Sequence, residues 1–346
     1  MAPSPRVSIV ITCFNYERFV RTAIDSALAQ DYPNIEVIAF DDGSTDGSLP
    51  VMQAYASRIT VFTQPNGGQV QATNRAFAHC TGEIVMFLDA DDVLLPGAVS
   101  AVVRNWTLRA VKAQFELAVI DGQGRPLGRQ FCNYVPGYDS AAVREEFRRF
   151  GTYVWPVNTG NAYHRDYLQR LMPLTVKAAP DGPLNTLAPL YGEVVVIQQT
   201  LGQYRLHDNN QSYHGVGPDQ LVQRFARQIA MRTAELALLQ QHAAAVGVAL
   251  PEGSLLDNDL VFINYRLMVR KAGGRYAGDD NDSAVGLATA AWRALRDRPL
   301  PWRQRVMHSA WLLALLPSPS ALARALVQLR FNRAALLRRR APLQTA

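Results

Sequence analysis

Acidic residues gather directly after one strongly apolar segment of the chain. The run Glu83–Leu88 is followed by Asp89, Asp91 and Asp92, with Ala90 between the first two. Alternate residues of an extended segment point the same way, so Asp89 and Asp91 can address one cation together. Carboxylates suit Mg²⁺ or Mn²⁺, which keep positions open for diphosphate oxygens, and such an ion would stabilise a departing diphosphate. The alternative is a surface turn that caps the next helix.

A second acidic pair, Asp41 and Asp42, stands in the run Phe40–Asp46. A carboxylate there can accept a hydrogen bond from the imide N–H of a uracil or thymine ring, a donor that cytosine lacks at that atom. The same residues also fit an Asp-Gly turn followed by a helix cap. The pair therefore indicates either a base-binding site or a plain turn.

Two further segments carry side chains that could reach the same place. Thr12 and Phe14 follow the first apolar run of the chain, and Phe14 would either stack on a base or join the core. The segment from Asn66 to Asn74 is a glycine turn that leads into a helix. The amino end of that helix would approach a nucleotide.

The elements that position these residues alternate along the first hundred residues. Short β-branched runs alternate with segments of helical periodicity, which is typical of βαβ units around a mainly parallel sheet. The carboxyl ends of such strands share one edge, where α/β proteins bind ligands. The fold class is therefore predicted to be α/β. We expect strands at 7–12, 35–40, 59–63 and 83–88, and helices at 16–30, 48–58 and up to about 79.

The pattern is more mixed after Pro96. The glycines between Asp121 and Gly128 lack dinucleotide-binding spacing, and Pro126 interrupts them, so a hairpin turn is predicted. A Gly- and Asp-rich loop at 273–282 leads to the last part of the chain. We expect a helix up to Arg104, strands at 115–120, 131–135 and 201–207, a helix at 140–150, and helical structure over 219–271 with a break at Pro251.

Composition indicates a folded protein of a reducing compartment. With 346 residues, 48% of them hydrophobic, the chain can bury a full core. Cys13, Cys80 and Cys132 are far apart and odd in number, which argues against a disulfide framework or a thiolate zinc site. The amino terminus has neither a signal-peptide pattern nor the length of a membrane span, so a cytoplasmic location is expected.

The net charge of +6 is concentrated in the last part of the chain. From Ala291 onward there are eleven arginines and one acid, Asp297, so the preceding residues carry a net charge of −4. Apolar groups with Trp302 and Trp311 alternate with these arginines, which is typical of interfacial helices on anionic lipid. We expect peripheral contact with the inner face of the membrane. A helix packed on the catalytic domain is the alternative, and nucleic-acid binding is disfavoured because no recognised module accompanies the charge.

These segments together resemble the family 2 glycosyltransferases of the GT-A fold. The resemblance covers about residues 7–96 and rests on the motifs Val7–Tyr16, Asp41–Asp46 and Gly82–Asp92 in this order. It implies a Rossmann-like, mostly parallel sheet flanked by helices, with a helical C-terminal extension. The chain departs from the family at Ala72–Asn74, where the family often has Ala-Arg-Asn. The implied donor-binding residues are Thr12, Phe14, Asp41, Asp42, Asn66, Asn74, Asp89 and Ala90.

The resemblance also implies a divalent metal, Mn²⁺ or Mg²⁺. Asp91 and Asp89 would bind it and bridge it to the donor diphosphate. His207, in the segment Gln203–Ser212 that resembles the family's Tyr-Arg-x-His sequence, would complete the metal shell or contact the diphosphate. A purely structural histidine is the alternative.

A base on a helix start is a further implication of the resemblance. Asp181 would take the proton of the attacking sugar hydroxyl. Pro180 replaces the glutamate that usually precedes this aspartate, and a plain helix cap at Asp181 is the alternative. Glu193 is the second candidate for the base.

The resemblance thus implies an inverting, metal-dependent glycosyltransferase that works by in-line displacement. The donor would be a nucleotide-diphosphate sugar, expected to be UDP-linked, and the acceptor a saccharide or lipid-linked molecule in polysaccharide or glycoconjugate biosynthesis. One alternative is a nucleotidyltransferase, which would need a Gly-rich phosphate loop, but Thr12–Arg18 contains no glycine or lysine. The other is a catalytically silent subunit that binds the nucleotide sugar without turnover. The expected domains are a catalytic domain at 1–215, a helical extension at 216–290 and a basic amphipathic tail at 291–346.

Overall fold

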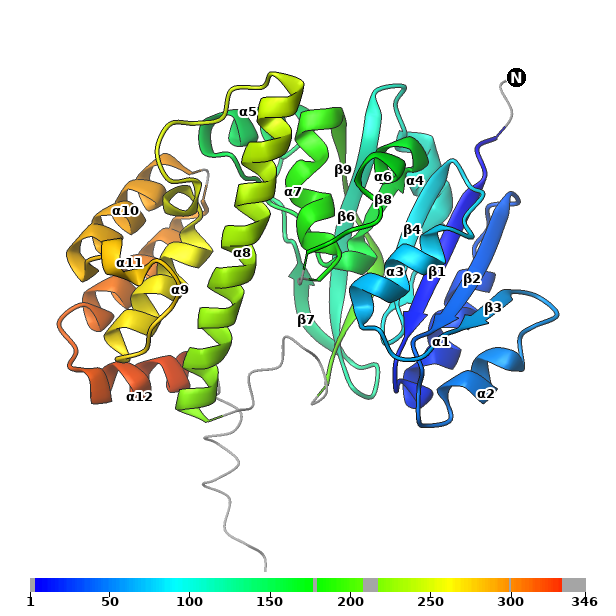
Figure 1. Ribbon diagram of the computed structural model, residues 1–346, viewed down its shortest axis with the longest axis horizontal. Helices are drawn as coiled ribbons and strands as arrows, with labels where there is room; N and C mark the ends of the chain where they lie inside the picture. The colour runs from blue at the N-terminus through cyan, green and yellow to red at the C-terminus, as the bar shows by residue number, and fades with distance from the viewer. Residues whose placement is uncertain (1–3, 177–178, 208–216, 299, 332–346) are drawn as a thin grey trace, which may run out of the picture. The chain divides into compact units, whose positions relative to one another are not determined.

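The computed structural model describes residues 4–176, 179–207, 217–298 and 300–331 (Figure 1). They form two compact units. The first unit contains the chain up to residue 149 together with residues 153–206 and 238–249. The second contains residues 150–152, residues 207–237 and the chain from residue 250 onward.

A mixed β-sheet forms the centre of the first unit. Within the described residues it has nine strands in the order β3-β2-β1-β4-β8-β6-β9-β5, with β7 paired to β6. Figure 1 shows the blue and cyan strands β1 to β4 beside the turquoise β6 and the green β8 and β9. The strands are β1 (Val7–Cys13), β2 (Ile35–Asp41), β3 (Thr60–Thr63), β4 (Ile84–Asp89), β5 (Val93–Leu94), β6 (Ala110–Asp121), β7 (Pro126–Phe131), β8 (Asn161–His164) and β9 (Glu193–Leu206).

The first four strands are parallel, as their sequence predicts. β2 pairs with β3 and with β1, and β1 pairs with β4, all in parallel register. The remaining strands are mixed, because β8 runs antiparallel to both β4 and β6, whereas β9 runs parallel to β6. The predicted α/β fold is confirmed.

The register of β1 aligns the strand ends that carry the predicted site. Thr12 lies opposite Phe40 of β2 on one side and opposite Asp89 of β4 on the other. Cys13 lies opposite Asp41. Because β1 and β4 are buried on both faces, their apolar, β-branched sequences fix this register from within the core.

Helices flank the sheet of the first unit. α1 buries one face, formed by Phe19, Val20, Ala23, Ile24 and Ala27, as the helical spacing of these residues predicts. The predicted helix at 140–150 is also present, as α5. The helices are α1 (Glu17–Leu28), α2 (Ser48–Gln53), α3 (Gln69–Phe77), α4 (Ala98–Asn105), α5 (Ser140–Phe150), α6 (Arg165–Leu171) and α7 (Asp181–Tyr191).

Two expectations about strands need correction. The expected strand at 131–135 is wrong, because β7 is Pro126–Phe131 and ends where that strand was expected to begin. All residues of β7 are exposed, so no alternation of apolar and polar residues marks its bounds. The expected strand at 201–207 is only the last part of β9, which begins at Glu193. The hairpin predicted between Asp121 and Gly128 joins β6 to β7.

The second unit is helical. It contains the first part of α8 (Pro218–Val246) together with α9 (Leu260–Lys271), α10 (Ala284–Asp297), α11 (Trp302–Leu315) and α12 (Ser320–Phe331). One apolar cluster joins all five helices, and it includes Phe225, Leu267, Ala291, Leu312 and Val327. The expected boundary between residues 290 and 291 lies inside α10. The last helices thus share a core with the preceding ones.

Trp311 is not available as a surface anchor. Its indole N–H donates a hydrogen bond to Asn264 Oδ1 at 2.8 Å, and the Arg330 guanidinium lies 4.5 Å from the ring centroid. The expectation for this residue is corrected, because its ring packs against the core of the second unit. Trp302 is 69% exposed. Among the helices of the described ranges, none combines the length and apolarity needed to cross a membrane.

Candidate active site

The acids predicted as metal ligands lie where the strand order of the sheet reverses. The chain passes from β1 to β2 and β3 on one side and then returns to β4 on the other side of β1. Ligands of α/β proteins bind outside the carboxyl ends of the strands at such a switch point. Asp89 ends β4, and Asp91 and Asp92 follow it in the turn before β5. We refer to Asp89, Asp91 and Asp92 as the acid cluster.

The 3-10 helix Asn158–Gly160 holds two members of the acid cluster. Asn158 Nδ2 donates to Asp89 Oδ1 at 2.8 Å, and the Thr159 hydroxyl donates to Asp92 Oδ2 at 2.6 Å. Both donor residues are buried. Sequence reasoning missed them, and the only available signal was a short polar run before β8.

Arg205 of β9 holds the same turn from another side. Its backbone N–H donates to Asp92 Oδ1 at 2.9 Å, and its Nε donates to the carbonyl oxygen of Asp91 at 2.7 Å. Its guanidinium also lies 5.0 Å from the ring centroid of Phe19. Arg205 therefore fixes the backbone of the acid cluster. The motif around His207 included this residue, but its role required the folded structure.

Burial and mutual repulsion raise the pKa values of two of these carboxyls. Burial raises the pKa of Asp89 to about 7, and the charge of Asp91 contributes to this. Burial, together with the charges of Asp91 and Asp89, raises the pKa of Asp92 well above its ordinary value. Burial and the charge of Asp91 also raise the pKa of the Tyr16 phenol. The site thus concentrates negative charge, which a bound cation would relieve.

Asp41 organises the turn that follows β2. Its carboxylate accepts hydrogen bonds from the backbone N–H of Gly43 at 3.2 Å and from the backbone N–H of Ser44 at 3.3 Å. The Thr63 hydroxyl donates to it at 2.9 Å. The Asp41 side chain is buried. In this structure it shapes the loop rather than facing outward.

Asp42 joins that turn to the glycine turn before α3. Its two carboxylate oxygens accept from the backbone N–H groups of Gly67 at 2.9 Å and Gly68 at 2.8 Å. Gly43 adopts a φ of +74°, and a Cβ there would lie 2.6 Å from the backbone nitrogen of Asn66. Only glycine permits this close approach. The structure therefore brings Asp42 and Asn66, both predicted to bind the donor, to adjoining turns.

The other predicted donor-binding residues differ in their surroundings. Phe14 is 43% exposed just beyond β1, whereas Ala90 is buried. Thr12 is partly buried at the end of β1. The Asn74 side chain exchanges two hydrogen bonds, of 2.9 and 2.8 Å, with the backbone of Leu174. Asn74 therefore anchors the segment that precedes α7.

Asp181, the predicted base, is the first residue of α7. Burial raises its pKa, although hydrogen bonds from the backbone N–H groups of Asp181 and Gly182 and the charge of Lys112 oppose this. Its own charge also contributes to the raised pKa of Asp89. The structure therefore brings Asp181 near the acid cluster from a helix start that is 92 residues away in the sequence.

The structure does not bring Glu193 to the acid cluster. It begins β9 just after the other end of α7, a helix of 11 residues and thus about 16 Å long. Its carboxylate accepts a hydrogen bond from the Thr107 hydroxyl at 2.6 Å. His207 directly follows β9 and belongs to the second unit. Residues 208–212 of its motif lie outside the described residues, and its role as a metal ligand stays a prediction.

Comparison with known proteins identifies the family of this domain. Residues 8–171 match the family described as Glycosyl transferase family 2. This match covers a little under half of the chain and assigns the family to this domain. An uncharacterized glycosyltransferase of Nostoc sp. is 32% identical over 213 residues, which make up 59% of this chain and 66% of that protein. The chondroitin synthase of Escherichia coli is 31% identical over 45% of this chain and 24% of its own length. The chain thus spans less than two thirds of either relative.

A solved structure shows the same fold. The mannosyltransferase of Pyrobaculum calidifontis, in complex with GDP-Man and Mn²⁺, superposes with a TM-score of 0.51. The match covers 97% of this chain and 87% of that chain at 16% sequence identity. At this identity the likeness establishes the fold alone.

The acid cluster of this family 2 domain fits a hard divalent cation. Mg²⁺ is usually held by one or two carboxylates and by substrate phosphates, not by a cage made of protein alone. Asp89 and Asp91 could supply two oxygen ligands of that kind. In the described part of the chain, no three His, Cys, Asp or Glu side chains are arranged to hold an ion by themselves. The carboxylate oxygens of Asp89 and Asp91 therefore suit an ion that is also bound by a diphosphate.

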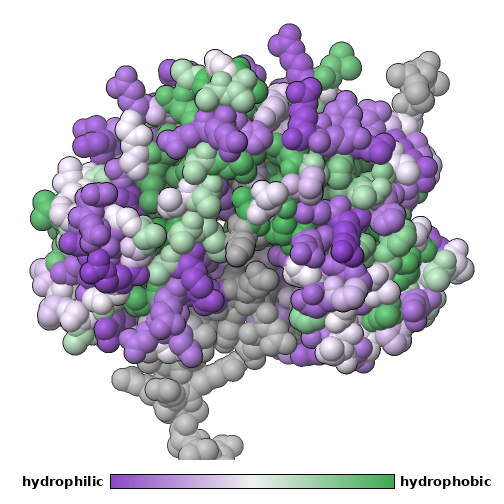
Figure 2. All heavy atoms as spheres, in the orientation of Figure 1, coloured by the Kyte–Doolittle hydropathy of each residue, from purple (hydrophilic) through white to green (hydrophobic). Residues whose placement is uncertain are grey.

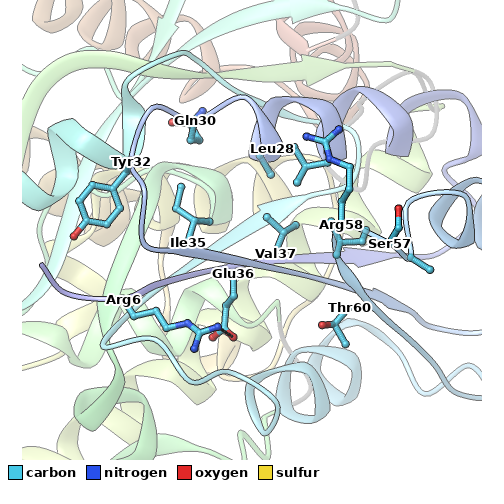
Figure 3. Close-up of a pocket in the computed structure, with 13 residues that line it drawn as sticks. Arg6, Leu28, Gln30, Tyr32, Ile35, Glu36, Val37, Ser57, Arg58 and Thr60 are labelled. Atoms are coloured by element: carbon cyan, nitrogen blue, oxygen red, sulfur yellow. Dashed lines mark ion pairs between the residues drawn. The ribbon is translucent and has the colours of Figure 1, made fainter.

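A hollow of about 550 Å³ lies at the opposite edge of the sheet (Figure 3). It is lined by residues at the starts of β2 and β3, such as Ile35 and Thr60. Figure 3 shows Arg6 and Glu36, two of the residues that line it, pointing toward one another, and their ion pair measures 3.1 Å. Because this is the amino-terminal edge of the parallel strands, the hollow is separate from the acid cluster.

Proposed function

We propose that this chain is a metal-dependent, inverting glycosyltransferase. It would take a sugar from a nucleotide-diphosphate donor, expected to be UDP-linked, and pass it to a saccharide or lipid-linked acceptor. The observation that carries the proposal is the acid cluster at the switch point of a family 2 domain. The similarity of the chain to a chondroitin synthase supports a role in polysaccharide or glycoconjugate synthesis. The complex of the Pyrobaculum mannosyltransferase with GDP-Man and Mn²⁺ supports a nucleotide-sugar donor and a metal.

Donor binding would use the residues at the carboxyl ends of β1, β2 and β4. Asp89 and Asp91 would hold Mn²⁺ or Mg²⁺, and the bound ion would supply positive charge to the leaving diphosphate. Asp42 and Thr12 would contact the nucleoside, and Phe14 would stack on the base. Asn158, Thr159 and Arg205 would keep the carboxylates in place. Their hydrogen bonds fix the positions of the carboxylates, which would limit reorganisation during the reaction.

Acceptor activation would fall to Asp181. As the acceptor oxygen forms its bond to the anomeric carbon, its O–H bond breaks and the proton passes to the Asp181 carboxylate. The bond to the nucleoside diphosphate breaks on the opposite face, which inverts the anomeric centre. The raised pKa of Asp181 makes it a stronger base than an exposed aspartate, provided that it is ionised.

The second unit has an exposed apolar stripe that would bring the chain to a membrane-associated acceptor. On α11, the exposed residues Trp302, Val306, Ala310 and Leu313 recur at helical spacing and form a narrow apolar stripe. Arg303 is exposed beside it. We propose that this stripe contacts the surface of an anionic membrane peripherally. Figure 2 shows hydrophilic side chains over much of the face that is drawn, with hydrophobic ones in small groups between them.

The direct test is sugar transfer and donor hydrolysis with uridine, guanosine and thymidine diphosphate sugars. Each donor is assayed with Mn²⁺, with Mg²⁺ and with excess chelator. We expect turnover with one donor class, abolished by chelator and restored by Mn²⁺. Full activity in chelator would contradict the role of the metal. Binding of a donor without any turnover would favour the silent subunit instead.

A further inference from the structure

A second hollow, of about 690 Å³, opens at the edge of the sheet where β6 and β9 begin. All of its lining residues belong to the first unit. One of them is Tyr191, the last residue of α7, whereas Asp181 is the first residue of that helix. Because α7 has 11 residues, about 16 Å separate its two ends. The hollow is therefore separate from the acid cluster, and the proposed mechanism does not use it.

Three arginines line this hollow from three different segments of the chain. Arg109 precedes β6, Arg144 lies on α5 and Arg170 lies in the last turn of α6. All three are exposed, and no acid within the described residues forms an ion pair with any of them. A guanidinium group binds a carboxylate or a phosphate through paired N–H groups. The hollow therefore suits a ligand that carries more than one anionic group.

The backbone that carries Arg109 is held in place. The Glu193 backbone N–H donates to the Arg109 carbonyl oxygen at 2.8 Å. A Cβ on Gly192 would lie 2.8 Å from the same oxygen and 2.5 Å from Val111 Cγ1, so glycine permits the two segments to approach this closely. These contacts join the start of β6 to the start of β9. This side of the hollow is thus formed by the fold itself.

Tyr191 adds an aromatic surface to the hollow. Its side chain is partly exposed, and the Arg170 guanidinium lies 5.9 Å from the ring centroid. The Tyr191 hydroxyl shares a hydrogen bond of 2.5 Å with His242 Nδ1, and the ring centroid lies 5.8 Å from that of the buried Tyr167. Because the hydroxyl is engaged and the ring is supported, a ligand would meet the ring. Aromatic rings of this kind pack against the apolar face of a sugar ring.

Two acids in the lining distinguish between classes of anionic ligand. Asp166 is exposed, and Glu193 accepts a hydrogen bond from the Thr107 hydroxyl at 2.6 Å. Carboxylates accept hydrogen bonds from sugar hydroxyls, but they repel the closely spaced phosphates of a nucleic acid or a polyphosphate. The lining therefore favours a ligand with hydroxyl groups, apolar ring faces and negative charges that are well separated.

We propose that this hollow binds an acidic saccharide chain: its carboxylates contact Arg109, Arg144 and Arg170, and one of its sugar rings packs on Tyr191. The volume of about 690 Å³ lies within the range of about 300–1,000 Å³ that is typical of ligand pockets. The inference goes beyond the proposed function, because the hollow holds the saccharide and no bond is made or broken there.

The first test measures binding by calorimetry at low ionic strength and without a nucleotide-sugar donor. The probes are tetragalacturonate and a tetrasaccharide of alternating glucuronate and N-acetylglucosamine, each compared with its carboxyl methyl ester. The esters keep the sugar rings but lack the charges. We expect at least one acidic chain to bind and its ester to bind at least about tenfold more weakly, because charge-assisted hydrogen bonds are lost. Equal binding of acid and ester, or no binding of either acidic chain, would overturn the proposal.

The second test locates the binding on the surface of the chain. Arg109→Gln and Arg170→Gln should each weaken the binding of the acidic chain about tenfold. Arg58→Gln is the matched control, because Arg58 is an exposed arginine of the same unit that lines the other hollow. Equal losses of affinity in all three variants would indicate general attraction to positive charge, and the inference would be wrong.

The third test concerns the aromatic ring. Tyr191→Phe keeps the ring and should bind the acidic chain as the unaltered chain does, whereas Tyr191→Leu should weaken binding about fivefold. A similar loss in both variants would show that the hydroxyl matters and not the ring. Thermal denaturation checks that both variants fold. If Tyr191→Leu does not fold, the variants of the exposed arginines decide whether the hollow is the site.

The remaining outcomes separate this inference from its alternative and from the proposed function. A single-stranded oligonucleotide that binds more tightly than either saccharide, and loses affinity in Arg109→Gln and Arg170→Gln, would make the hollow a nucleic-acid site and overturn the inference. If the unaltered chain transfers no sugar from any donor, the proposed function fails. The binding measurements need no turnover, so they still decide whether the hollow takes an acidic saccharide.

Discussion

The two units hold neighbouring acidic side chains in opposite ways. In the second unit the buried Arg266 lies between two acids, since its NH1 donates to Asp257 at 2.5 Å and its Nε donates to Asp282 at 2.7 Å. Burial alone would lower the pKa of Arg266, but the hydrogen bonds and charges of Asp282 and Asp257 outweigh it and raise the pKa. In the first unit the acid cluster contains three neighbouring carboxylates that repel one another. The acids beside Arg266 are neutralised by a partner, whereas clustered like charges with perturbed pKa values are typical of functional sites.

The largest effect on stability is expected in the second unit. Arg266→Met removes the cation between two acids and should lower the free energy of unfolding by about 3–5 kcal/mol, because it leaves partly buried carboxylates without their partner. Urea unfolding measures this. Arg275→Met is the control, since Arg275 is exposed and its ion pairs should be worth less than about 1 kcal/mol. Equal losses of stability for both variants would show that the pairing of the buried Arg266 with its two acids does not specially stabilise the second unit.

The corresponding change in the first unit should act on turnover. Asp91→Asn is expected to reduce kcat/KM about 10²–10³-fold, because the ion that stabilises the leaving diphosphate loses a ligand. The change also removes the charge that contributes to the raised pKa values of Asp89 and Asp92. Steady-state kinetics measure the loss, with Asp280→Asn as an exposed acid for comparison. A variant with normal turnover would show that the acid cluster is not the metal site.

Metal binding should stabilise the folded chain through the acid cluster alone. In the presence of UDP, Mn²⁺ at about 100 times its Kd should add about 2.7 kcal/mol to the free energy of unfolding. Thermal denaturation over a Mn²⁺ titration measures this. Mn²⁺ should not raise the free energy of unfolding of Asp91→Asn. It should still raise that of Asp257→Asn, in which the changed acid is a partner of Arg266. An equal gain in both variants would place the ion elsewhere.

The raised pKa of Asp89 predicts how stability depends on pH. The folded chain holds this proton up to about pH 7, whereas the unfolded chain releases it near pH 4, so stability should fall as the pH rises between these values. Asp89→Asn removes the titrating group and should be more stable than the unaltered chain at pH 8 by about 1–3 kcal/mol. Unfolding curves from pH 4 to 8 without metal test this. A variant that is less stable at pH 8 would contradict the stated cause.

The smallest effect is expected at the exposed stripe of α11. Trp302→Ala should change the free energy of unfolding little, because the ring is mostly in solvent. It should weaken cosedimentation with anionic vesicles by up to about tenfold, on the order of 1 kcal/mol. Leu108→Ala, an exposed apolar residue of the first unit, is the matched control. Equal partitioning of all three proteins would argue against membrane contact through this stripe.

The parallel half of the sheet was predictable because its signals are local. The β-branched runs of β1, β2 and β4 and the apolar face of α1 each reflect burial that a short window of sequence records. The acids at the strand ends follow from the same pattern. By contrast, β8 has four residues and β7 is exposed throughout, so neither leaves a periodic signal. The roles of Asn158, Thr159 and Arg205 depend on partners that are distant in the sequence.

The sequence by itself determined where the parallel strands lie along the chain, the acids that end them and the excess of arginine toward the end of the chain, because each depends on residue type and short-range spacing. Only the tertiary structure decided that Asp181 approaches the acid cluster and that Glu193 lies at the far end of α7. It also decided that Trp311 packs inside the second unit. These outcomes depend on burial and on charges brought together across many residues, which local sequence does not encode.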